Sequence, residues 1–161
     1  MSEPGSEAEA LTKDEALAEL ARRGIIGPDV WLLDVLPLVE MAWSDGAIQP
    51  EERQLIAAFL EEHVEAVNRE AGQAVASMAS ASAFVQRFLA TRPTAQEFRE
   101  LRMMLRVLRL AGPQREVRAR RIVEAASNVG GVSPSPSDPR TPWDRAEVQC
   151  LWELEASLLP R

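Results

Sequence analysis

The chain has 161 residues, a length that supports one buried core and makes two independent cores unfavourable. Alanine and leucine outnumber the β-branched and aromatic residues, a balance that favours helices over strands. One cysteine, Cys150, excludes an internal disulfide and is typical of a reducing compartment. The N-terminus has no apolar signal region, and no apolar run approaches the roughly 20 residues of a membrane-spanning helix. We therefore expect a cytoplasmic protein that does not insert into a membrane.

The net charge of −7 is distributed unevenly along the sequence. Residues 1–70 carry 16 acids and 5 bases, residues 71–121 carry 3 acids and 10 bases, and residues 122–161 carry 6 acids and 3 bases. An acidic protein as a whole repels nucleic acid, although its basic segment is still available to phosphates. We expect the acidic and basic segments to pair with each other inside one fold.

The first half of the chain contains clear helix start and stop signals. Residues 1–10 have too little apolar content to fold, so an acidic disordered N-terminus is predicted before a domain over 11–161. Thr12 is predicted to cap the first helix, and Gly24 to end it. A second helix is expected to start at Gly27-Pro28-Asp29, and Pro37 inside its apolar pattern predicts a kink or a break.

The second half continues with the same kinds of signal. A turn at Ser44-Asp45-Gly46 precedes a helix that starts near Pro50, and an Ala/Ser-rich segment follows over 71–91. Thr94 and Glu97 form a capping-box pattern, which predicts a helix over 95–111. A helix over 113–128, a Gly/Ser/Pro-rich loop over 129–141 and a last helix capped by Thr141 complete the chain.

Because no strand pattern competes with these helices, the sequence predicts an all-α fold, a single compact bundle of six or seven helices. Two segments, 30–68 and 113–160, read as copies of one helix-turn-helix unit. Each has a small acidic or amide residue before glycine and then a helix start of the form X-Pro-x-acid. The matching residues are Asp45-Gly46 with Gln49-Pro50-Glu51-Glu52, and Asn128 and Gly130-Gly131 with Thr141-Pro142-Trp143-Asp144.

One stretch is similar to a known family: Ala42-Trp43-Ser44-Asp45-Gly46-Ala47-Ile48-Gln49-Pro50-Glu51-Glu52-Arg53. It resembles the TerB-like domains, which are associated with tellurite resistance and also occur at the N-terminus of some membrane-bound DnaJ-type co-chaperones. Those domains show Ala-x-x-Asp-Gly, a short apolar step and a Pro-Glu-Glu-Arg helix start. Gly130-Gly131, Asp144 and Glu147 match the second half of the family pattern more loosely.

The chain departs from the family pattern at Gln49, where Ser, Thr or Asp is usual, and at Asn128, where a carboxylate is usual. The resemblance implies an all-α fold with acidic surface sites, sometimes metal-binding, in stress-response or defence systems. It implies no established reaction.

Asp45 and Glu52 are the candidate metal ligands. With Gly46 and Ile48 they coincide with the second half of an EF-hand loop, but Met41 and Trp43 stand where the first ligands belong, which excludes a true EF-hand. If a cation binds, these two hard oxygen ligands suit calcium or magnesium, held weakly with several waters retained. The alternative, which the small number of ligands favours, is that Asp45 belongs to a turn and Glu52 complements the helix dipole.

The sequence contains no recognisable set of catalytic residues. His63 is the only histidine and is predicted to lie on an exposed, solvated helix flank. Cys150 is predicted to be a core thiol, and no phosphate-binding glycine pattern occurs. We therefore predict a protein that is not an enzyme.

A stripe of arginines is the other conspicuous feature. Because aromatic residues are not interleaved with it, pairing within the chain or with an acidic partner surface is favoured over phosphate contact. Of the four tryptophans, Trp31 and Trp152 are predicted to pack in the core, while Trp43 and Trp143 lie beside the two turns as possible interface anchors. The stripe comprises Arg99, Arg102, Arg106, Arg109, Arg115, Arg118, Arg120 and Arg121.

These features predict a non-catalytic TerB-like adaptor that binds a protein partner, with a divalent cation as a possible ligand, in a stress-response or defence complex. The alternative is a nucleic-acid-binding helical protein that uses the arginine stripe over 99–121. The sequence specifies neither the oligomeric state nor the partner.

Overall fold

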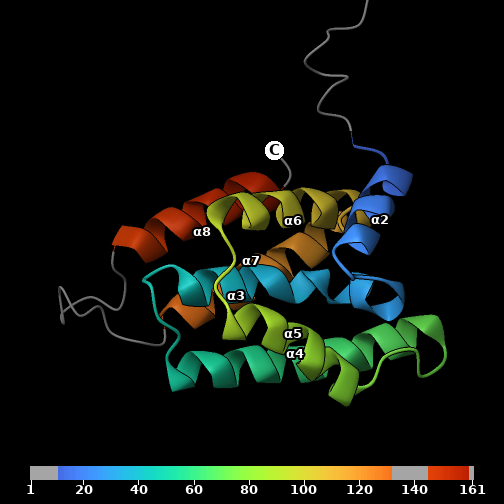
Figure 1. Cartoon of the computed structure of the whole chain (residues 1–161), viewed down its shortest axis with the longest axis horizontal. Helices are drawn as coiled ribbons and strands as arrows, with labels where there is room; N and C mark the ends of the chain where they lie inside the picture. The colour runs from blue at the N-terminus through green and yellow to red at the C-terminus, as the bar shows by residue number, and fades with distance from the viewer. Residues whose placement is uncertain (1–10, 132–144, 160–161) are drawn as a thin grey trace, which may run out of the picture.

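The structure, a computed structural model, describes residues 11–131 and 145–159. Within these ranges it contains seven α-helices, one 3-10 helix and no strand, which confirms the predicted all-α fold (Figure 1). The elements are α2 (Lys13–Arg22), η1 (Gly27–Val35), α3 (Leu36–Trp43), α4 (Pro50–Ala71), α5 (Met78–Ala90), α6 (Ala95–Leu108), α7 (Arg115–Gly131) and α8 (Arg145–Leu158). None of the helices in the described ranges is both long and apolar enough to cross a membrane.

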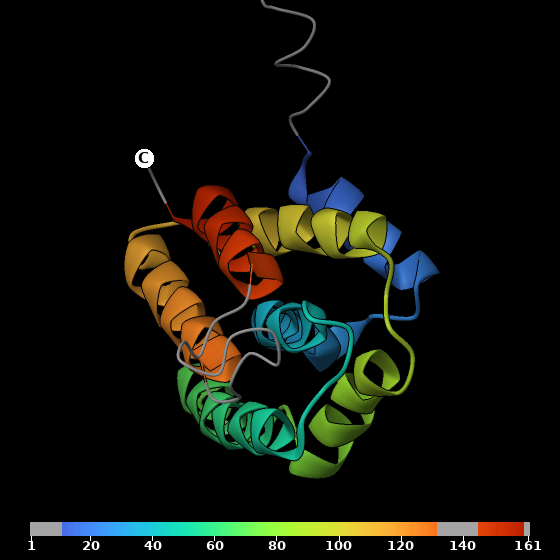
Figure 2. The same cartoon turned by 90° about the vertical axis from the view of Figure 1, so that its left-hand side faces the viewer.

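Helix α3 forms the centre of the bundle. Figure 2 shows it end-on, surrounded by the other helices, and it contacts η1 and each of α4 to α8. A helix that is apolar on all sides belongs in the interior rather than at the surface. Six of its eight residues are buried, namely Leu36, Pro37, Leu38, Val39, Met41 and Ala42. Buried apolar residues from all the helices join them in one continuous cluster.

The helix before α3 breaks where proline predicted it would. Residues 27–35 form a 3-10 helix, and α3 starts at Leu36 with Pro37 in its first turn. Proline has no N–H to donate to the preceding turn, so it starts the new helix without losing a hydrogen bond there.

The predicted helix caps are also present. The Thr12 hydroxyl accepts from the Glu15 N–H at 3.1 Å, and Gly24 takes a φ of 77° just after α2. The Thr94 hydroxyl likewise accepts from the Glu97 N–H at 3.0 Å. The two threonine caps satisfy N–H groups that have no partner within the helix, whereas the Gly24 N–H donates to the Ala21 carbonyl oxygen at the C-terminus of α2.

The C-terminal third departs from the prediction at α7. This helix continues to Gly131, so 129–131 belong to it and not to the predicted loop, and Asn128 lies inside the helix. Val129 and Gly130 are buried, and α7 packs along α3, so tertiary packing outweighs the low helix propensity of glycine. The predicted residues Thr141, Trp143 and Asp144, like residues 1–10, lie outside the described residues.

Candidate functional site

The two predicted cation ligands lie on either side of the turn between α3 and α4. Gly46 takes a φ of 97°, which L side chains rarely adopt and which lets the chain reverse direction after Asp45. Asp45 is exposed, and its Oδ1 accepts from the Ala47 N–H at 3.4 Å. Glu52 is 1% exposed, and its Oε1 accepts from the Gln49 N–H at 2.6 Å, so this carboxylate closes the N-terminus of α4.

Glu52 lies in a negative environment. Burial raises the pKa of Glu52 to about 7, and repulsion from Asp45, Glu147 and Glu51 adds to the rise, while the hydrogen bond from Gln49 opposes it. Glu147, in the first turn of α8, is 2% exposed. The acidic starts of α4 and α8 therefore lie within electrostatic range of each other.

In the second unit of the predicted repeat, the residue whose charge acts on Glu52 is not the one that the sequence suggested. Asn128 was expected to be the counterpart of Asp45, but it is an exposed residue within α7. Glu147, which the family pattern matched only loosely, is instead the described residue of α8 whose charge reaches Glu52.

No group of three or more histidine, cysteine, aspartate or glutamate side chains in the described ranges is arranged to hold a metal ion. Calcium takes six to eight oxygen ligands, so Asp45 and Glu52 would depend on water and main-chain oxygens for the rest. A tight cage built from these side chains is therefore excluded within the described ranges, and weak cation binding by Asp45 and Glu52 stays a prediction.

His63 does not lie on a solvated flank, so that prediction was wrong. It is 2% exposed, with Nε2 2.7 Å from the Trp31 carbonyl oxygen and 3.7 Å from Asp34 Oδ2. The carbonyl only accepts, so Nε2 carries the hydrogen. Burial lowers the pKa of His63, and the nearby charge of Asp34 opposes the shift. The sequence did hold a signal, because His63 follows Ile56 and Phe59 at helical spacing on the buried face of α4.

Asp34 belongs to a buried ion pair that links η1 to the end of α6. It is 1% exposed, and Arg109 donates to it twice, from Nε to Oδ1 at 3.0 Å and from Nη2 to Oδ2 at 3.3 Å. The Arg118 side chain in turn donates to the Arg109 carbonyl oxygen at 2.7 Å. Such a two-pronged contact holds both charges in one geometry and compensates for their burial.

A second buried pair links α3 to α6. Arg102 Nη1 donates to Glu40 Oε2 at 3.0 Å, while Glu40 Oε1 and Arg102 Nε are buried without a partner. Burial raises the pKa of Glu40 to about 7 even though Arg102 opposes the shift. Cys150 lies near this pair and is 7% exposed, which confirms that it is a core thiol, and burial raises its pKa. A raised pKa keeps the sulfur in its unreactive thiol form.

Among the described residues, six of the eight arginines of the stripe contact other side chains of the fold, including Arg99, which donates to Gln96, and two do not. Arg102, Arg109 and Arg118 form ion pairs with Glu40, Asp34 and Glu70, all within the acidic first 70 residues. These pairs confirm that the basic and acidic segments meet inside the fold. Arg120 pairs locally with Glu116, and Arg121 lies over the Phe59 ring at 4.9 Å. The side chains of Arg106 and Arg115 make no hydrogen bond or ion pair with the described residues.

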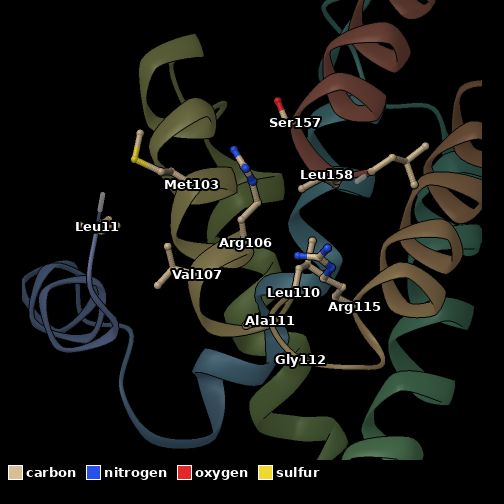
Figure 3. A pocket seen from close by; sticks show the side chains of 11 residues that line it. Leu11, Met103, Arg106, Val107, Leu110, Ala111, Gly112, Arg115, Ser157 and Leu158 are labelled. Atoms are coloured by element: carbon tan, nitrogen blue, oxygen red, sulfur yellow. The ribbon is translucent and has the colours of Figure 1, made fainter. Parts of the chain in front are cut away.

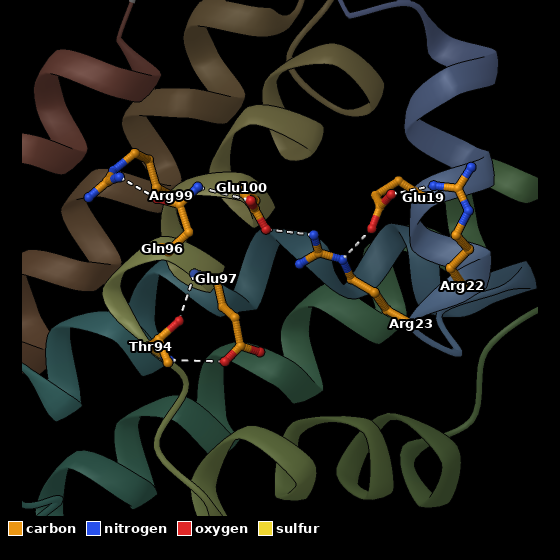
Figure 4. A network of polar contacts seen from close by, with 8 residues as sticks. All are labelled: Glu19, Arg22, Arg23, Thr94, Gln96, Glu97, Arg99 and Glu100. Atoms are coloured by element: carbon orange, nitrogen blue, oxygen red, sulfur yellow. Dashed lines mark hydrogen bonds and ion pairs between the residues drawn. The ribbon is translucent and has the colours of Figure 1, made fainter.

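Charges between α2 and α6 are joined in a continuous network (Figure 4). Arg23 Nη2 bonds Glu100 Oε1 at 2.6 Å, and Arg23 Nε bonds Glu19 Oε2 at 3.0 Å. Gln96 extends the network by donating to Glu100 Oε2 at 2.9 Å. We call this network, which also includes Arg22 and Arg99, the α2–α6 seam.

Farther along α6, toward its C-terminal end, a groove of about 450 Å³ lies between Leu11, α6 and the C-terminal end of α8. Arg106 and Arg115 extend into it (Figure 3). The rest of its lining is mostly apolar, and Met103, which borders it, is 44% exposed. We call this feature the α6–α8 groove and define it by Met103, Arg106, Val107, Leu110, Arg115 and Leu158.

The tryptophans do not all occupy their predicted places. Trp152 is 62% exposed on α8, so its assignment to the core was wrong. Trp31 is partly buried, and Trp43 donates from Nε1 to the Phe88 carbonyl oxygen at 2.8 Å, which fixes it beside the turn. Trp143 lies outside the described residues.

No protein-family model, curated protein or solved structure matches the chain. The TerB-like resemblance over 42–56 therefore stays a prediction, carried by the residues of the α3–α4 turn.

Proposed function

We propose that this chain is a non-catalytic binding module of the TerB-like type, which holds a protein partner of a stress-response or defence complex at the α6–α8 groove. The observation that carries the proposal is that Arg106 and Arg115 have no side-chain partner among the described residues. These two exposed arginines border an apolar groove and make no side-chain contact with a carboxylate of the described residues. Surface hollows that combine apolar lining with a few polar groups are the usual places for ligands.

The state of the chain's one imidazole and one thiol supports a non-catalytic role. His63 is buried and bonded to a main-chain carbonyl, and Cys150 is buried with a raised pKa. His63 lines no surface hollow among the described residues. Cys150 borders one of about 230 Å³ beside Glu40, but it is 7% exposed and its raised pKa disfavours the thiolate that nucleophilic catalysis requires.

A protein partner is favoured over nucleic acid because most arginines of the stripe already contact other residues of the chain. Four of its eight members form ion pairs within the chain, and Arg121 lies over Phe59. Binding to DNA and RNA at low and at physiological salt tests this choice. We expect no tight complex, whereas tight binding with a steep salt dependence would support the nucleic-acid alternative.

A photo-crosslinking residue in place of Met103, with Met78 as the matched control, tests the docking site in the host cell. Met78 is also a surface methionine, 38% exposed, but it lies on α5 away from the groove. We expect a protein captured from position 103 and not from position 78, which then binds the purified chain in isolation. Capture of the same proteins from both positions, or failure of the captured protein to bind, would contradict the proposal.

Weak divalent-cation binding by Asp45 and Glu52 is a second candidate function. The observation that favours it is the meeting of the α4 and α8 starts, where repulsion from Asp45, Glu147 and Glu51 helps to raise the pKa of Glu52. A calcium or magnesium ion there would reduce this repulsion while keeping most of its waters.

Thermal unfolding with millimolar calcium tests the cation site. We expect the parent to gain thermal stability and Asp45→Ala to gain less, while Glu61→Ala, which removes an exposed acid farther along α4, responds like the parent. Equal responses of the parent and Asp45→Ala, or no response, would assign Asp45 to the turn alone.

A further inference from the structure

We infer that the occupant of the α6–α8 groove is a peptide segment of the partner that presents a carboxylate beside an apolar side chain. This inference rests on the proposed function and adds the chemistry of the partner. It follows from three properties of the groove, namely its unpaired charge, its apolar wall and its size.

The groove carries positive charge that has no carboxylate partner among the described residues. Arg106 projects from α6 and Arg115 from the start of α7, so two different elements bring cationic groups to one hollow (Figure 3). Elsewhere on α6 and just after it, Arg102 and Arg109 have carboxylate partners at 3.0 Å. Guanidinium groups bind carboxylates through paired, charge-assisted hydrogen bonds. A carboxylate from outside the described residues is the group that complements Arg106 and Arg115.

Apolar side chains line the groove beside its two arginines. Leu110 and Leu158 are mostly buried at 8% and 5% exposure, Val107 is half-buried, and Met103 leaves 44% of its surface exposed. An apolar side chain inserted here covers the exposed part of Met103, and removal of that apolar surface from water favours binding. Methionine adapts its shape to different apolar partners, which suits it to a binding surface.

The size of the groove limits the occupant. A hollow of about 450 Å³ accommodates one large apolar side chain together with a carboxylate, but it is far smaller than a docked helix of roughly 10 Å diameter needs along its length. A short segment with Asp or Glu next to Leu, Phe or Met fits these limits. A C-terminal apolar residue, whose own carboxylate replaces the acidic side chain, has the same chemistry.

Selection from a random peptide library against the full chain tests the inference, with peptides displayed both internally and with free C-termini. We expect the selected peptides to carry a carboxylate adjacent to an apolar residue. Synthetic versions of these peptides should lose at least tenfold in affinity for Arg106→Gln/Arg115→Gln. They should bind Arg53→Gln/Arg99→Gln like the parent, because that control removes the same charge from exposed arginines outside the groove.

Three results would overturn the inference. The first is a set of selected peptides without carboxylates, and the second is equal affinity for both double variants. The third is binding that appears only after Glu3, Glu7 and Glu9 are replaced by Gln in the full chain, because the groove would then belong to the chain's own N-terminus. Peptides of another chemistry that bind at Met103 would end this inference and leave the proposed function standing. Failure of the crosslinking at Met103 would end the proposed function itself.

Discussion

The α2–α6 seam and the α6–α8 groove lie next to each other along α6, and both contain arginines, which within the described ranges are paired in the seam and unpaired in the groove. In the seam, Arg23 forms ion pairs with Glu19 and Glu100, so the charges of these side chains are neutralised within the fold. In the groove, Arg106 and Arg115 border an apolar hollow and have no such partner among the described residues. The difference teaches that an arginine stripe read from sequence mixes residues that hold the fold with residues that are available to a ligand.

The largest expected effect on stability comes from replacing a buried, paired arginine. We expect Arg109→Gln to lower the free energy of unfolding by about 3–5 kcal/mol, because it leaves Asp34 buried at 1% exposure without its charged partner. Urea denaturation followed by circular dichroism measures the change. Arg106→Gln, a few residues away on the groove side, should change it by less than about 0.5 kcal/mol. Equal losses in the two variants would erase the distinction between the paired and the unpaired arginines.

Buried carboxylates also differ in whether they are paired. Asp34 has an arginine partner, whereas the charges that act on Glu52 are negative. The pKa of Glu52 is raised to about 7, so its contribution to stability is full below about pH 4.5 and is lost as the pH rises through 7. We expect the parent to lose up to about 3 kcal/mol across this window relative to Glu52→Gln, whose amide still caps α4. Denaturation at pH 5 and pH 8 with a chelator present measures it. Parallel pH profiles of the two proteins would show that Glu52 is not perturbed.

The seam itself should contribute little to stability. Arg23 and Glu100 are 25% and 37% exposed, and ion pairs at such positions stabilise by about 1 kcal/mol or less. We expect Arg23→Gln to lower the free energy of unfolding by that amount, with the effect shrinking in 1 M salt. If Arg23→Gln instead lowered the free energy of unfolding by about 3 kcal/mol and salt did not change this loss, the seam would stabilise the fold as strongly as the buried ion pairs do.

The smallest stability effect belongs to the groove. Arg106→Gln/Arg115→Gln should leave the melting temperature within about 2 °C of the parent value, because neither side chain contacts a carboxylate of the described residues. Differential scanning calorimetry measures this shift. A large drop would mean that the two arginines support the fold, and the groove could then not be treated as a surface reserved for a partner.

The placement of the two candidate cation ligands, Asp45 and Glu52, was partly predictable from the sequence. The spacing of Asp45 and Glu52 around Gly46 was readable because the turn and the helix start are local features. The approach of Glu147 to Glu52 was not predictable. Glu147 lies 95 positions after Glu52 in the sequence, and the packing of α8 into the bundle brings the two residues near each other. For His63 the spacing after Phe59 was a usable signal, but polarity alone suggested the surface.

By itself, the sequence determined the helical class, the break at Pro37 and the caps at Thr12 and Thr94, since these depend on φ restrictions and on hydrogen bonds within four residues. Only the tertiary structure decided that α7 continues to Gly131, that Arg102 and Arg109 pair inward, and that Arg106 and Arg115 face a groove. The spacing along a helix specifies which residues share a face. The partner that meets that face depends on how distant helices pack, and this is a property of the whole bundle.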